Sequence, residues 1–88
     1  MTRYVVSRTR AWLSEEELAA FVECAPSIRE PFEAHVRWLR SDILREADGT
    51  LSALCVYEAT SPEWIIKLSE AAMLPTDSIK PLVVSQAA

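Results

Sequence analysis

The chain has 88 residues, half of them hydrophobic, and a formal net charge of −4 from nine Lys and Arg against thirteen Asp and Glu. This length allows one domain, residues 1–88, which buries only about two thirds of its unfolded-chain surface. The basic residues are scattered, which excludes the usual nucleic-acid-binding stripe. No segment approaches the roughly 20 apolar residues of a membrane span, and no leader-like sequence opens the chain. We therefore expect a soluble cytoplasmic protein with neither nucleic acid nor membrane as a partner.

The first third of the chain predicts a strand followed by a helix. Residues 4–8 begin with Tyr-Val-Val, which favours a β-strand. Ser14 can cap a helix, and Glu17 three residues later completes a capping box. The helix has one apolar stripe with the spacing i, i+3, i+4 and i+7, formed by Leu18, Phe21, Val22 and Ala25. Pro26 is expected to kink or end this helix, with a short helix restarting over residues 27–32.

The middle of the chain predicts a β-hairpin. Residues 36–44 and 51–59 both show the alternation of a strand. Asp48 and Gly49, the only glycine, lie between them and favour a type I′ turn, because both turn positions tolerate a positive φ.

The last third predicts a second helix and a final strand. The helix begins near Ser61-Pro62 and ends before Pro75. Its expected buried stripe is Ile65, Leu68 and Ala72. Residues 79–84 form the last strand, and Pro81 within it favours an edge position, because proline cannot donate to a sheet ladder.

The order strand-helix-strand-strand-helix-strand is typical of a ferredoxin-like α+β fold. The four strands are expected to be antiparallel in the order 4-1-3-2, with both helices on one face of the sheet. The other face is then bare and needs a partner or a ligand.

The hairpin strands carry two alternating sets of side chains. One set is aliphatic: Leu39, Ile43, Leu54 and Val56. The other is mixed and includes Trp38, Arg40, Cys55 and Tyr57. We expect the aliphatic set beneath the helices and the mixed set on the open face, where pairing brings Trp38 near Tyr57 and Arg40 near Cys55. These four residues are our predicted ligand-binding residues; packing between subunits, with Arg40 and Asp42 as an interface ion pair, is the alternative.

Several segments resemble a family of small bacterial proteins, formally a domain of unknown function with some members called nickel-binding. The similar segments are Val36–Ser41, Leu54–Ala59 with Ser61, and Ala71–Ile79. The resemblance implies a ferredoxin-like subunit that packs its open face against a second copy, giving a dimeric α/β barrel. Nickel-binding relatives are richer in histidine, including on the second helix, where this chain has Ser69, Glu70 and Ala71. The resemblance therefore implies membership of this family but not a nickel site in this chain.

The residues themselves give little support to metal or cofactor chemistry. His35 is the only histidine, whereas a nickel or zinc site needs several converging His or Cys ligands. Cys24 and Cys55 are expected to be buried free thiols, and no phosphate-binding glycine loop exists. No metal site and no cofactor are predicted.

These observations predict a homodimer that binds a small organic molecule in a barrel cavity formed by the open faces. Whether the chain is an enzyme is left open by the sequence. The first alternative is a cofactor-free oxygenase, cyclase or isomerase that uses the same cavity, an analogy from fold alone. The second is a nickel or other divalent-metal protein, by family name.

Overall fold

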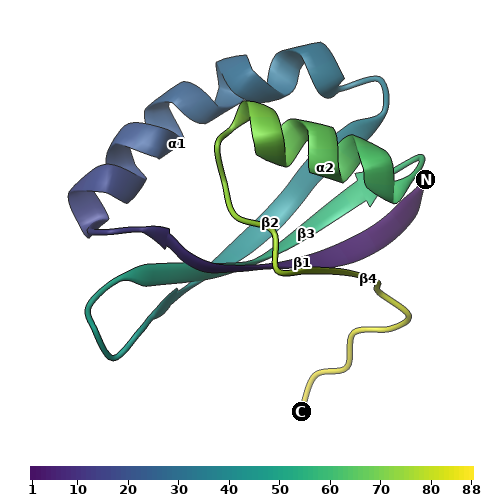
Figure 1. Ribbon diagram of the computed structural model, residues 1–88. Coiled ribbons are helices and arrows are strands. Elements are labelled where there is room, and N and C mark those ends of the chain that lie inside the picture. Colours follow the sequence, from purple (N-terminus) through teal and green to yellow (C-terminus); the bar gives the residue numbers. More distant parts are fainter.

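The computed structural model of the protein describes residues 1–88. Its elements are β1 (Thr2–Trp12), α1 (Glu15–Arg29), a 3-10 turn (Glu30–Phe32), β2 (Val36–Arg45), β3 (Leu51–Ala59), α2 (Pro62–Ala71) and β4 (Ser78–Pro81). The strands are antiparallel in the order β2-β3-β1-β4, and both helices lie on one face of the sheet (Figure 1). The predicted ferredoxin-like order and topology are confirmed.

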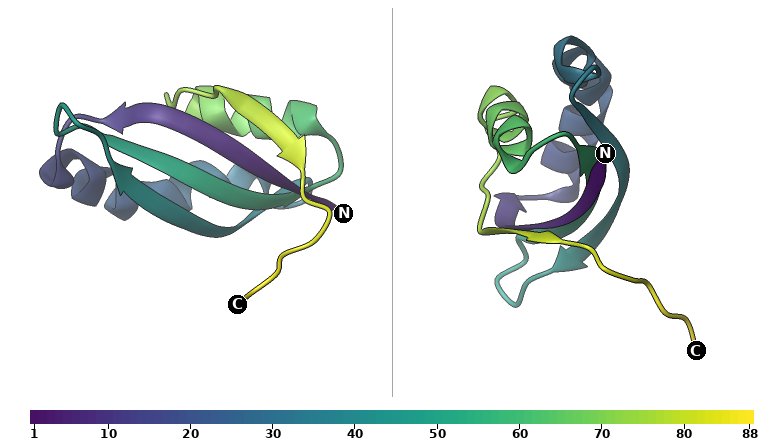
Figure 2. Two further views of the ribbon diagram at one scale, coloured as in Figure 1. Left: turned by 90° about the horizontal axis from the view of Figure 1, so that it is seen from below. Right: turned by 90° about the vertical axis from the view of Figure 1, so that its right-hand side faces the viewer.

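The two layers leave one face of the sheet uncovered. Figure 2 shows α1 and α2 side by side on one side of the curved sheet, with nothing on the other. β4 is an edge strand, as Pro81 predicts, although it ends at Pro81 and is shorter than expected. The residues after β4 run away from the sheet as an extended tail (Figure 2). The helices therefore cover a single interior, between themselves and the sheet.

Helix α1 begins as predicted but continues past the predicted break. The Ser14 hydroxyl accepts a hydrogen bond from the Glu17 backbone N–H at 3.2 Å. The helix then passes through Pro26 and ends at Arg29, so the predicted break is wrong. Proline removes one helical hydrogen bond, but the N–H of Glu30 donates to the Pro26 carbonyl and resumes the ladder. Ala25 and Ile28, on either side of Pro26, face the interior, so packing holds the helix across the proline.

The strand β1 alternates strictly until an irregularity at its end. Tyr4, Val6 and Arg8 are buried, while Val5 and Ser7 between them are half-buried. The register against β3 shifts between Arg8 and Trp12, and Arg10 has a positive φ of 51°. This bulge turns Arg10 outward, where its Nε pairs with Asp48 at 3.0 Å. Trp12 then returns to the interior beneath α1.

The β2–β3 connection is a longer loop than the predicted type I′ turn. Gly49 has a φ of 89°, but Asp48 has no positive φ, so the two-residue turn is wrong. The N–H of Gly49 donates to the Glu46 carbonyl, which is the pattern of a type I turn followed by a left-handed glycine. The Asp48 carboxylate accepts bonds from the Thr50 hydroxyl and N–H, and these lower its pKa to about 2.

One hydrophobic cluster joins the sheet to α2. Ile65 is fully buried and Leu68 nearly so, which confirms two positions of the predicted stripe; Ala72 is half-buried. The cluster consists of Tyr4, Val6, Trp12, Val36, Leu51, Ala53, Cys55, Tyr57, Ala59, Ile65 and Leu68. Most residues of this cluster come from β1 and β3, the two central strands. None of its eleven residues belongs to α1.

Candidate functional site

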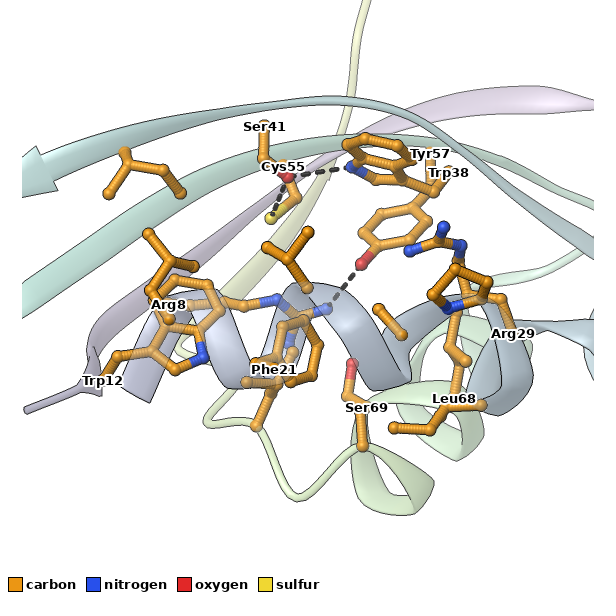
Figure 3. Close-up of a pocket in the computed structure, with 18 residues that line it drawn as sticks. Arg8, Trp12, Phe21, Arg29, Trp38, Ser41, Cys55, Tyr57, Leu68 and Ser69 are labelled. Carbon is orange, nitrogen blue, oxygen red and sulfur yellow. Dashed lines mark hydrogen bonds between the residues drawn. The ribbon is translucent and has the colours of Figure 1, made fainter. Parts of the chain in front are cut away.

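A cavity of about 220 Å³ lies between the sheet and the helices, most of it beneath α1. It is larger than the apolar cavities of about 150 Å³ that hold benzene in other proteins. Thirteen of its 18 lining residues are hydrophobic. The lining is Arg8, Trp12, Leu18, Phe21, Val22, Ala25, Pro26, Ile28, Arg29, Trp38, Ser41, Ile43, Cys55, Tyr57, Leu68, Ser69, Ala72 and Leu74 (Figure 3). A protein interior normally has few voids larger than a water molecule, so this hollow is unusual for so small a domain.

The cavity explains why α1 packs loosely. Of its fifteen residues only Ala25 is buried, and its remaining inward-facing apolar residues, Leu18, Phe21 and Ile28, are half-buried. Four lining residues are exposed: Val22 at 59 % and Pro26 on α1, and Trp38 and Ile43 on β2 at 42 % and 40 %. The cavity therefore opens to solvent between α1 and the edge strand β2.

The predicted ligand-binding residues do not all lie where the sequence placed them. Trp38, Cys55 and Tyr57 line the cavity beneath the helices, so their predicted position on the open face is wrong. Cys55 and Tyr57 are 3 % and 6 % exposed. Arg40 lies on the open face as expected, and its Nη2 bonds to Asp42 at 2.6 Å in an exposed ion pair. The structure thus brings three of the four residues together and leaves Arg40 apart.

Two physical causes account for this correction. First, Leu54 and Val56 face outward because the alternate residues of β3 are also apolar and pack into the hydrophobic cluster instead. Second, β2 has a bulge at Leu39: Trp38 pairs with Tyr57 as predicted, but Arg40 pairs with Val56. The extra residue turns Arg40 to the face opposite Trp38 and brings Ser41 opposite Cys55.

Arg8 is the most unusual residue of the cavity. It is 1 % exposed, yet no Asp or Glu pairs with it and none lines the cavity. Its Nη1 donates to the Pro75 carbonyl at 2.9 Å and to the Thr76 hydroxyl at 3.1 Å, and its Nη2 donates to the Tyr57 hydroxyl at 3.2 Å. Figure 3 shows the side chain lying between Trp12 and Tyr57. Buried charges are normally paired, because removing an ion from water is costly.

Donors without acceptors gather around this guanidinium. Its three hydrogen bonds use three of the five guanidinium N–H groups, so two remain, one on Nη2 and one on Nε. The Arg8 Nε is buried without a partner, and so is the Trp12 indole Nε1. These two atoms are the only buried side-chain nitrogens or oxygens in the chain without a hydrogen bond. Both belong to residues that line the cavity.

Tyr57 adds a further donor at the same place. Burial raises the pKa of its phenol, while the charge of Arg8 acts in the opposite direction. The hydroxyl is therefore neutral near pH 7, accepts the bond from Arg8 and keeps its own proton available. The guanidinium carbon of Arg8 also lies 5.7 Å from the centre of the Tyr57 ring.

The wall formed by β2 and β3 is held by a short chain of hydrogen bonds. The Trp38 Nε1 donates to the Ser41 hydroxyl at 2.8 Å, and this hydroxyl donates to the Cys55 Sγ at 3.0 Å (Figure 3). Arg29 from α1 lies over the Trp38 ring, with its guanidinium carbon 4.8 Å from the ring centre. The mouth of the cavity therefore has a positive charge as well.

Elsewhere the chain shows no second cluster of reactive groups. His35 stacks on Trp64 with ring centres 3.9 Å apart. No group of three or more His, Cys, Asp or Glu side chains is placed to hold a metal ion. Cys24 is exposed, which corrects the expected burial, and Cys55 is a buried free thiol as predicted. No helix has the length and apolarity to cross a membrane.

Arg8 was not among the predicted site residues. The only signal was its position: Tyr4, Val6 and Arg8 are spaced by two, so a strand that buries the first two also buries the arginine. The cavity itself leaves no signature, because its lining comes from five different elements.

Comparison with known proteins supports the fold. No protein-family model and no curated protein matches the sequence. The crystal structure of SCO4226 from Streptomyces coelicolor A3(2) is similar over 96 % of this chain and 99 % of that one, with a TM-score of 0.68 and 14 % sequence identity. At this identity the similarity concerns the fold, and it agrees with the ferredoxin-like topology.

Proposed function

We propose that the protein binds a small organic molecule in the cavity between its sheet and its helices. The observation that supports this most is the cavity of about 220 Å³ with a mainly hydrophobic lining, a few convergent polar groups and exposed residues at its mouth. Binding sites for small molecules have these properties. The proposed binding site is therefore a cavity within each subunit and not the predicted pocket between two open faces. Trp38, Cys55 and Tyr57 belong to both.

Binding is favoured over catalysis by the kinds of residue in the lining. A general base near neutral pH is normally His, Asp or Glu, and the lining contains none of these. The phenol of Tyr57 is held neutral by burial, so it can donate a hydrogen bond but not accept a proton. The nickel alternative has no supporting group of ligands in the subunit.

Partly filling the cavity should weaken ligand binding. Ala25 is buried in α1 and lines the cavity, so Ala25→Leu places three further carbon atoms within it. We expect compounds from a library of small organic molecules to shift the NMR signals of lining residues in the wild type, and their affinity to fall at least tenfold in Ala25→Leu. The matched control is Ala20→Leu, an exposed alanine of the same helix. A wild type whose lining signals respond to no compound would contradict the proposal.

We also propose that two copies pack through their open sheet faces. The support is the exposed apolar surface on that side: Leu54 on the central strand β3 is 40 % exposed and Leu44 on β2 is 47 % exposed. Patches of this kind on a small domain are typical of interfaces. Arg40 and Asp42 would lie at the border of such an interface.

A charge at the centre of the open face should separate the two copies. We expect the wild type to sediment at twice the chain mass of 9.9 kDa and Leu54→Asp to sediment as a single chain, because the substitution buries an unpaired carboxylate in the interface. Ile66→Asp is the matched control, since Ile66 is similarly exposed but lies on α2. It should remain dimeric. A wild type that sediments at 9.9 kDa at high concentration would rule out the dimer.

A further inference from the structure

We propose that the molecule bound in the cavity is an organic anion, with an apolar body and one carboxylate whose oxygens accept hydrogen bonds from Arg8. This inference rests on the proposed function, since it specifies the class of ligand that the same cavity takes.

The geometry of Arg8 supports a carboxylate as the missing partner. Its Nη1 is fully used by Pro75 and Thr76, whereas the Nε–H has no acceptor and one N–H of Nη2 is left over. Nε and Nη2 form one edge of the guanidinium plane. A carboxylate accepts two parallel hydrogen bonds from such an edge. The bonds from Nη1 and Nη2 hold the guanidinium in place, so the free Nε–H is oriented before a ligand binds.

Charge in the cavity points to the same class. The lining contains Arg8 and Arg29 but no acidic residue, although the whole chain has more acidic than basic residues. Arg29 lies at the mouth over Trp38, where it would attract an anion, and Arg8 lies buried within. An anionic head group would neutralise the buried guanidinium, which no group of the protein does.

The remaining donors complete the site. Trp12 Nε1 is buried without an acceptor, and the Tyr57 hydroxyl has a proton to donate. Both belong to the cavity wall on either side of Arg8 (Figure 3). The apolar body of the ligand would lie against the residues of α1, chiefly Phe21 and Ile28. A neutral hydrocarbon would leave all of these N–H and O–H groups unsatisfied.

Three probes separate the anion from the apolar body: 3-phenylpropionate, its uncharged analogue 3-phenylpropionamide, and acetate. The affinity of each for the full chain is measured at pH 7 by NMR titration, with the Nε–H signals of the arginines recorded. We expect 3-phenylpropionate to bind at least tenfold more tightly than either of the other two. It should also shift the Arg8 Nε–H signal, because that group gains a charged acceptor.

Variants test whether Arg8 is the residue responsible. Arg8→Met should bind 3-phenylpropionate no more tightly than the amide. The Nε–H signal that is present in the wild type and absent in Arg8→Met is the signal of Arg8. Arg45→Met is the control, because Arg45 is an exposed arginine paired with Glu15 away from the cavity. It should leave all three affinities unchanged. If Arg8→Met does not fold, Trp12→Phe, which removes only the indole N–H, should weaken carboxylate binding more than amide binding.

The outcomes distinguish this inference from the function on which it rests. Equal affinity for the amide and the carboxylate, with no shift of the Arg8 signal, would overturn the anion proposal and leave an apolar ligand. Equal affinity for acetate and 3-phenylpropionate would leave an anion site but overturn the proposed binding of an apolar molecule. Binding of none of the three would overturn the anion proposal and count against the proposed function.

Discussion

Trp12→Ala is expected to lower the free energy of unfolding by about 3–5 kcal/mol, the usual cost of removing a buried tryptophan side chain. Trp12 is 5 % exposed, and its ring packs against Phe21 with centres 5.4 Å apart. After the bulge at Arg10, Trp12 is also the residue that brings β1 back into the interior beneath α1. A domain of this size has little stability to lose, so much of the variant should be unfolded at 37 °C. Urea denaturation followed by circular dichroism measures the effect.

Trp38→Ala provides the comparison for Trp12. Trp38 is 42 % exposed at the mouth of the cavity, so its removal should cost clearly less stability and weaken ligand binding more. Similar losses of stability in the two variants would show that the interior beneath α1 contributes less to folding than its burial indicates.

Ile65→Ala is expected to lower the free energy of unfolding by about 2–5 kcal/mol. Ile65 is 0 % exposed and is the residue of α2 that lies deepest in the hydrophobic cluster. For a domain of this length, a loss of about 2 kcal/mol already lowers the melting temperature by roughly 8 °C or more. Differential scanning calorimetry would detect this shift.

The neighbouring Ile66 is a direct control for Ile65. It is 43 % exposed, about 100° around the helix axis from Ile65, and Ile66→Ala makes the same chemical change. We expect its effect to stay within about 0.5 kcal/mol, as for other surface substitutions. A comparable loss for Ile66→Ala would mean that α2 is covered on its outer side by another part of the assembly.

The architecture could be predicted because the periodicity and turn residues of each short segment indicate the element that the segment forms. The alternation at Tyr4 and Val6, the cap at Ser14 and the edge proline at Pro81 each reflect the chemistry of one short segment. Pro26 was misread for the opposite reason: contacts on either side of it, distant in sequence, outweigh its local preference.

The site could be predicted only in part, because it depends on two features that periodicity does not record. The bulge at Leu39 separates Trp38 from Arg40, although residues two apart on a regular strand share a face. Both alternating sets of β3 are apolar, so the aliphatic content of Leu54 and Val56 does not decide which set turns inward. Arg8 was not predicted, because arginine is rarely buried without an acidic partner.

The bulge at Leu39 also bears on how far copies of this chain can associate. It interrupts β2, one border of the sheet, whereas β4, the other border, has only four residues and ends at Pro81. An unbroken row of backbone donors and acceptors would let sheet join sheet without limit, the route to fibres. Bulges, short edge strands and prolines are features by which sheet borders avoid such pairing, so both borders of this sheet disfavour growth from edge to edge.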